Sequence, residues 1–286
     1  MARELEVKMS LTAEAQTAAA GWLVSRPQAV DGEVTELVNT YYDTPSGELN
    51  RQAIALRVRQ AGNRFIQTLK TRGEFKDGAH QRQEWEWDLP DACLNLGLIA
   101  DTPACQDINL AALIPVFETN FQRHTVMLQD GEADIECALD RGTIVAGGSE
   151  LPLIELELEL KAGNDQQLVH WSRRLADQVP VFLNLVSKAE QGYFLAGLYQ
   201  PTLPPTDTDP VYRLLAGLSA VWLTGKTGLL TSDVMSAVEP EVHSRGLGSL
   251  LDWLKSGLAR GVSLAELCND LKVGQLQTRL VGPRAN

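Results

Sequence analysis

Two stretches that lie far apart in the chain alternate charged and apolar residues without a break. They are Glu4-Leu5-Glu6-Val7-Lys8 and Glu155-Leu156-Glu157-Leu158-Glu159-Leu160. Because successive side chains of a β-strand point to opposite faces, each stretch would have one charged and one apolar face. Such a strand can simply be a solvated edge, but the alternation recurs in most of the other strands that the sequence predicts.

Further strands are predicted at residues 33–42, 53–60, 65–72, 81–89, 117–128 and 132–139, and the second stretch above belongs to a strand at 153–161. Their charged positions are Arg57, Arg59, Lys70, Arg82, Glu84, Glu86, Arg123, Asp134 and Glu136. Asp140-Arg141-Gly142 has the composition of a turn and is predicted to be one. The sequence thus predicts a β-rich region in which many charges share strand faces with one another.

Composition limits the partners. The 286 residues carry a net charge of −12, which argues against nucleic acid as the main partner. The four cysteines form no C-x-x-C pair and the four histidines are isolated, so neither a thiolate nor a histidine metal site is expected. The N-terminus lacks an apolar signal core, and no apolar run has the roughly 20 residues of a membrane helix. We expect a soluble, cytoplasmic protein without membrane contact.

Three segments together resemble the CYTH family of triphosphate tunnel metalloenzymes. They are the N-terminal Glu-x-Glu-x-Lys motif, Tyr41-Tyr42-Asp43-Thr44, and Ser187-Lys188 in a segment similar to the family's closing one. The resemblance covers roughly residues 1 to 200. It implies an α+β fold, in which a closed antiparallel eight-stranded β-barrel forms a tunnel with a charged lumen and flanking helices.

The chain divides into three predicted parts: residues 1–200 as the tunnel domain, 201–210 as a proline-rich linker, and 211–286 as a small helical region. Asp209-Pro210 is a typical helix start, with a capping side chain followed by proline. Some CYTH proteins carry a histidine-rich helical CHAD domain at this place. The C-terminal region here has one histidine and is short, so it is not assigned to CHAD.

The resemblance assigns roles to the charged faces. The expected catalytic residues are Glu4, Glu6, Lys8, Glu84 and Glu86. The expected substrate-binding residues are Lys8, Arg57, Arg59, Lys70, Arg82, Arg123 and Lys188. The expected metal ligands are Glu4, Glu6, Asp134, Glu136, Glu155, Glu157 and Glu159. A site made of carboxylates alone is typical of Mg²⁺ or Mn²⁺.

The activity that the resemblance implies is metal-dependent hydrolysis of inorganic triphosphate to pyrophosphate and phosphate. Alternatives are a thiamine or nucleoside triphosphatase, and a non-catalytic polyphosphate-binding protein whose C-terminal region binds a protein partner. Class IV adenylyl cyclases are also similar, but they typically have His-Phe before the acidic motif, where this chain has Ala2-Arg3.

Overall fold

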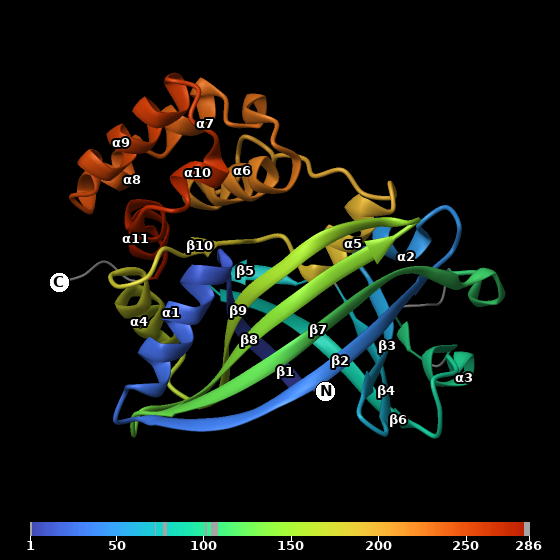
Figure 1. The fold of residues 1–286 in the computed structure, drawn as a ribbon. Coiled ribbons are helices and arrows are strands. Elements are labelled where there is room, and N and C mark those ends of the chain that lie inside the picture. The colour runs from blue at the N-terminus through green and yellow to red at the C-terminus, as the bar shows by residue number, and fades with distance from the viewer. Residues whose placement is uncertain (1, 72, 77–78, 101, 104–107, 283–286) are drawn as a thin grey trace.

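A computed structural model describes residues 2–71, 73–76, 79–100, 102–103 and 108–282, without the side chains of residues 2–4, 74–76 and 79–82. One antiparallel sheet dominates the fold (Figure 1). Its strands are β1 (Ala2–Ser10), β2 (Ala29–Asp43), β3 (Ala55–Ala61), β4 (Arg64–Lys70), β5 (Glu74–Lys76), β6 (Ala79–Leu89), β7 (Ile114–Gln129), β8 (Ala133–Ala146), β9 (Ser149–Gly163) and β10 (Phe182–Leu183).

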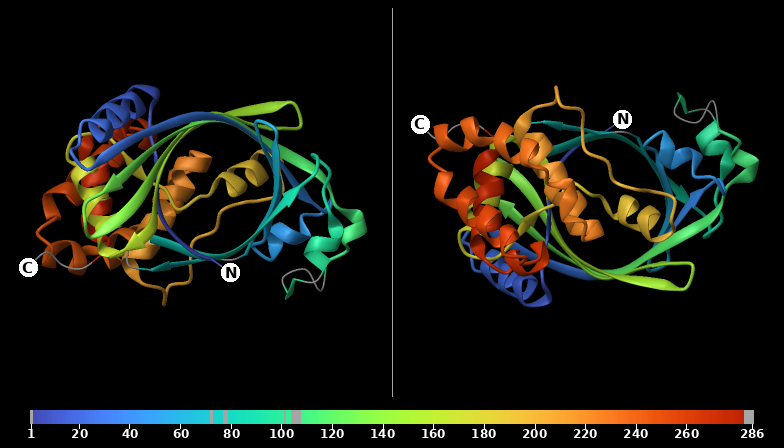
Figure 2. Two further views of the ribbon diagram at one scale, coloured as in Figure 1. Left: turned by 90° about the horizontal axis from the view of Figure 1, so that it is seen from below. Right: turned by 90° about the horizontal axis from the view of Figure 1, so that it is seen from above.

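The sheet order is β10-β1-β9-β8-β7-β2-β3-β4-β6-β5. Because β1 pairs with β6 as well as with β9, eight strands follow one another in a ring from β1 through β9 to β6 and back to β1. Figure 2 shows this ring along its axis. The predicted α+β fold with an antiparallel sheet and flanking helices is confirmed. The sheet has ten strands where the sequence predicted eight, because the short β5 and β10 are added to it.

The predicted turn at residues 140–142 is wrong. β8 runs without a break from Ala133 to Ala146 and pairs with both β7 and β9. A Cβ atom at Gly142 would lie 2.0 Å from the carbonyl oxygen of Asn120 on β7, so this glycine allows close approach of the neighbouring strand. Asp140 therefore lies in the middle of the sheet, with its side chain fully buried.

Helices cover the outside of the ring and one of its ends. The first set is α1 (Ala13–Val24), α2 (Glu48–Arg51), α3 (Leu96–Ala100), the 3-10 turn η2 (Leu110–Ala112), α4 (Gln166–Ala176) and α5 (Lys188–Leu195). The C-terminal set is α6 (Pro210–Thr224), the 3-10 turn η3 (Thr227–Leu229), α7 (Ser232–Ala237), α8 (Glu239–Ser244), α9 (Gly248–Ala259), α10 (Leu264–Leu267) and α11 (Leu271–Leu280). Within the described ranges, no helix is long and apolar enough to cross a bilayer.

The apolar faces of β1, β8 and β9 pack under α1 and α4. Met9, Leu156 and Trp171 are almost completely buried there. Burying each such side chain contributes about 1.5–3 kcal/mol. Leu215 of α6 and Val281 belong to the same core, so the C-terminal helices pack on the ring. Since the apolar faces point outward, the charged faces of these strands point into the ring.

Candidate functional site: a charged cavity inside the ring

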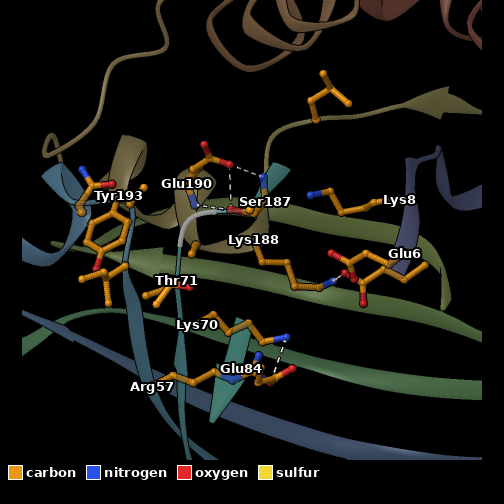
Figure 3. A pocket seen from close by; sticks show the side chains of 18 of the residues that line it. Glu6, Lys8, Arg57, Lys70, Thr71, Glu84, Ser187, Lys188, Glu190 and Tyr193 are labelled. Carbon is orange, nitrogen blue, oxygen red and sulfur yellow. Dashed lines mark hydrogen bonds and ion pairs between the residues drawn. The ribbon is translucent and has the colours of Figure 1, made fainter. Parts of the chain in front are cut away.

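A cavity of about 810 Å³ lies inside the ring. Its walls are formed by β1, β3, β4, β6, β7, β8 and β9 and by the first residues of α5. Figure 3 shows charged side chains from several of these elements, among them Glu6, Lys70 and Lys188, pointing into one space. The cavity thus gathers both signs of charge from strands that are distant in the sequence.

A row of three carboxylates crosses one wall, and we call it the acidic row. Glu6 on β1 is the direct cross-strand partner of Glu159 on β9, which in turn faces Glu136 on β8. Like charges placed directly opposite each other destabilise a sheet. Lys161 offsets part of this repulsion, with its Nζ 2.9 Å from Glu159 Oε1 and 3.5 Å from Glu136 Oε1. The repulsion within the acidic row favours the binding of a cation.

Lys188, at the start of α5, contacts three further carboxylates. Its Nζ lies 2.7 Å from Glu157 Oε1, 2.8 Å from Glu155 Oε2 and 3.0 Å from Asp140 Oδ2. Burial alone would lower the pKa of Lys188, but Glu155, Glu157 and Asp140 raise it well above its ordinary value. Burial alone would raise the pKa of Glu157, but the positive charges of Lys188 and Arg123 lower it well below its ordinary value. Lys188 and Glu157 are therefore both charged at neutral pH.

Arg123 is held in place by an aspartate that the sequence did not suggest. Its Nε and Nη2 each donate to Asp140 at 2.7 Å, and Nη2 also donates to Glu157 Oε2 at 2.9 Å. Burial would lower the pKa of Arg123, but Asp140 and Glu157 raise it above its ordinary value. The signal for Asp140 was present in the sequence, because it follows Glu136 at a spacing of four on a strand and so shares its face.

Arg57 and Arg59 on β3, together with Lys70 on β4, form what we call the basic wall. The Nε atom of Arg57 is buried and has no hydrogen-bond partner among the described residues. Arg59 donates from Nε to Asn39 Oδ1 at 2.7 Å. Burial, together with the nearby charges of Arg57 and Arg123, lowers the pKa of Arg59 to about 9. This crowding of arginines is the electrostatic signature of an anion site.

A neutral side chain at Arg59 is expected to stabilise the ligand-free protein and weaken phosphate binding. Because folding lowers the pKa of Arg59, keeping this side chain charged costs the folded protein stability at every pH below about 9. Arg59→Gln should therefore raise the melting temperature without ligand. It should also lower kcat/KM for triphosphate by about one to two decades, the usual worth of a charge-assisted hydrogen bond.

Arg64→Gln is the matched control for this change, because Arg64 pairs with Asp88 on the exposed side of the same hairpin, at 70% and 78% exposure. Its melting temperature and kinetics should stay at wild-type values. An Arg59→Gln protein that is less stable and fully active would show that Arg59 only balances the lumen carboxylates.

The cavity brings together most of the predicted site residues. Those that line it are Glu6, Lys8, Arg57, Arg59, Lys70, Glu84, Glu86, Arg123, Glu136, Glu157, Glu159 and Lys188. Glu155 is buried behind the wall, where it contacts Lys188 and accepts a hydrogen bond from Gln191. Asp134 is not part of the lining and accepts a hydrogen bond from Gln129. The side chains of Glu4 and Arg82 lie outside the described part of the chain.

Glu84 and Glu86 both point into the cavity, as the sequence predicted. Lys70 Nζ lies 3.1 Å from Glu84 Oε1, and the Thr68 hydroxyl donates to Glu86 Oε1 at 3.2 Å. Sequence reasoning missed other lining residues, which are Tyr41, Lys161, Tyr193, Tyr199, several residues between 202 and 208, and Tyr212. Among the described residues, no group of three or more histidine, cysteine or acidic side chains forms a ready-made metal site.

The ring and its charged cavity define the class of protein. The CYTH domain family matches residues 2–193, and the chain belongs to this family. A curated relative, an inorganic triphosphatase of Haemophilus influenzae, is 32% identical over 197 residues. The match covers 68% of this chain and 55% of the relative, so the chain spans about half the length of that protein.

The fold has a counterpart among solved structures. A putative adenylyl cyclase from Hippeastrum, whose structure is described as revealing a dominant triphosphatase activity, superposes with a TM-score of 0.50. It is 16% identical, and the match covers 69% of this chain and 98% of that one. At this identity the likeness shows the fold alone.

Proposed function

We propose that the protein hydrolyses inorganic triphosphate to pyrophosphate and phosphate, and that the ring acts as the tunnel in which the substrate binds. The observation that carries this proposal is the pairing of a crowded basic wall with an acidic row inside one cavity. A phosphate chain would relieve the repulsion among the arginines. The family and the similarity to an inorganic triphosphatase over two thirds of this chain support the same substrate class.

The basic residues have the geometry to hold a polyanion. Arg57 and Arg59 lie two residues apart on one strand face, so their Cα atoms are spaced by about 7 Å along β3. Each guanidinium can bind a phosphate in a bidentate way, whereas Lys8 and Lys70 contribute point charges. The unpartnered Nε of Arg57 is available to such a phosphate oxygen.

The acidic row fits a hard divalent cation such as Mg²⁺ or Mn²⁺. Its oxygen-only donor set matches the preference of these ions. Its three carboxylates lie on neighbouring strands. Among the described cations, Lys161 forms ion pairs with two of these carboxylates, Glu136 and Glu159. Glu6, Glu136 and Glu159 would hold the ion once their side chains move together, because the described residues form no ready-made site. When bound, it would supply charge neutralisation and an activated water for attack on a terminal phosphorus.

The chain's own groups would provide positioning. In the proposed reaction a water oxygen bonds to a terminal phosphorus, the bond from that phosphorus to the bridging oxygen breaks, and pyrophosphate leaves with the negative charge. Arg57, Arg59 and Arg123 would balance that charge, and phosphoryl transfer needs little else from a protein. Asp140 acts through Arg123, whose orientation it fixes by two hydrogen bonds.

The experiment that tests this function compares phosphate release from triphosphate, ATP and thiamine triphosphate, with Mg²⁺, with Mn²⁺ and with a chelator. We expect triphosphate to be the preferred substrate and the chelator to remove the activity. Preference for thiamine triphosphate or ATP would instead identify an organic triphosphatase. Triphosphate binding without turnover under any metal would identify a polyphosphate-binding protein.

A further inference from the structure

The segment between α5 and α6 has a second role besides connecting them. Its residues 201–209, which we call the strap, were predicted to be a linker. Thr202, Leu203, Pro204, Pro205 and Thr208 of the strap line the cavity. Figure 2 shows the strap running across one end of the ring, and Tyr212 of α6 lines the cavity beside it. Among the described residues, no such segment crosses the opposite end of the ring (Figure 2).

The strap is fixed by the C-terminal helices at several points. Leu203 packs against Gly217 of α6, where an added Cβ would lie 3.3 Å from Leu203 Cδ2. The carbonyl oxygen of Pro204 accepts a hydrogen bond from Arg213 Nε at 3.3 Å. Arg213, which is 6% exposed, is itself held by an ion pair with Asp233 of α7 at 3.2 Å. The prolines of the strap stiffen it further, so the strap has little freedom to move aside.

The strap residues that line this end of the cavity are neutral. Leu203, Pro204 and Pro205 offer no charge to a phosphate, in contrast to the basic wall deeper inside. The nearby carboxylate of Glu190 accepts hydrogen bonds from Ser187 and from the Tyr199 hydroxyl, at 2.9 and 3.4 Å. A phosphate chain that passed out of the cavity here would therefore meet carbon atoms and a negative charge.

Resting on the proposed function, we infer that the strap closes one end of the tunnel and so makes the site specific for a free phosphate terminus. A chain would enter end-first from the end that the strap does not cross, and its terminal phosphates would lie on the basic wall. Longer polyphosphates would then bind only through their ends. A chain with both terminal phosphates blocked would not bind, because it cannot thread through a tunnel that is closed at one end.

The test compares two long inorganic polyphosphates of equal length, one with free ends and one with both terminal phosphates capped by an alkyl amine. Binding is measured by the ligand-induced rise in melting temperature, which needs no turnover. We expect the capped chain to bind at least about tenfold more weakly, the scale on which a site rejects a group that it has no room for. Equal binding of the two chains would overturn the inference.

Two variants test whether the strap causes the weaker binding of the capped chain. Arg213→Met removes the hydrogen bond to Pro204, and Leu203→Gly removes the anchor over Gly217, so each should strengthen binding of the capped chain relative to the free one. Arg279→Met is the matched control, because it breaks an ion pair of α11 with Asp177 away from the strap. If both strap variants keep the wild-type ratio, the strap does not close the tunnel. Absence of triphosphate hydrolysis by the wild type would overturn the proposed function alone.

Discussion

Glu6→Gln is expected to abolish metal-dependent turnover of triphosphate while the protein stays folded. Glu6 is 4% exposed and sits at one end of the acidic row, next to Glu159. The amide keeps the shape of the side chain but removes the negative charge that would hold a divalent cation. We expect kcat to fall by at least about 100-fold, since even residues that only support metal ligands are worth about 10–100-fold.

The measurement is phosphate release at saturating Mg²⁺ or Mn²⁺, together with the melting temperature with and without metal. Asp134→Asn is the matched control, because Asp134 carries the same charge on β8 of the same sheet without lining the cavity. It should keep full activity and the full metal-induced rise in melting temperature. Wild-type turnover by Glu6→Gln would remove this carboxylate from the metal site.

Lys188→Met is expected to give the largest loss of stability. Its ammonium group is buried between Asp140, Glu155 and Glu157, and methionine would leave these carboxylates in mutual repulsion. Breaking a buried charge cluster by removing one partner costs about 3–5 kcal/mol. Urea unfolding at neutral pH measures this difference in the free energy of unfolding.

The pH dependence of the stability that Lys188→Met loses follows from the same cluster of charges. In the wild type the lowered pKa of Glu157 contributes stability above about pH 4.5, which is lost as the pH falls through the lowered value. The raised pKa of Lys188 contributes stability below about pH 10.5, which is lost as the pH rises through the raised value. In Lys188→Met the crowded carboxylates should bind protons more readily when folded, so the deficit should shrink toward acid pH.

Divalent metal gives a second readout of the same variant. With Lys188 gone, Mg²⁺ should raise the melting temperature of the variant more than that of the wild type. Lys272→Met is the control, because Lys272 is 42% exposed and its ion pair with Asp270, outside the cavity lining, should be worth less than about 1 kcal/mol. A Lys188→Met protein as stable as Lys272→Met at neutral pH would contradict the buried-cluster interpretation.

The alternation of charged and apolar residues was enough to predict most strands and most of the charged residues that line the cavity. It worked for Glu6, Arg57 and Glu157 because a ring places one whole face of each strand inside. It did not work at Asp140, because Asp-Arg-Gly is also a turn sequence. Only the structure shows that Gly142 allows β7 and β8 to approach each other closely.

The strap could not be predicted as part of the cavity. A proline-rich segment has no periodicity that reports what it faces, and its placement depends on contacts such as that of Arg213 with Pro204. The lowered pKa of Arg59 was only partly predictable. Its burial and Arg57 on the same strand face are the larger causes, but the contribution of Arg123 on β7 arises because the ring brings β7 near β3. Such properties depend on tertiary distances, which the sequence pattern does not contain.

The place of β1 in the ring has a consequence for how the protein folds. β1 precedes the other strands of the sheet in sequence, yet its partners β6 and β9 come much later in the chain. Pairings between such distant segments form slowly, because a long loop must close first. Glu6 and Lys8 therefore meet their neighbours only when the ring is complete. Since the ligand site does not exist before that step, triphosphate and metal would bind the native state alone and stabilise it by mass action.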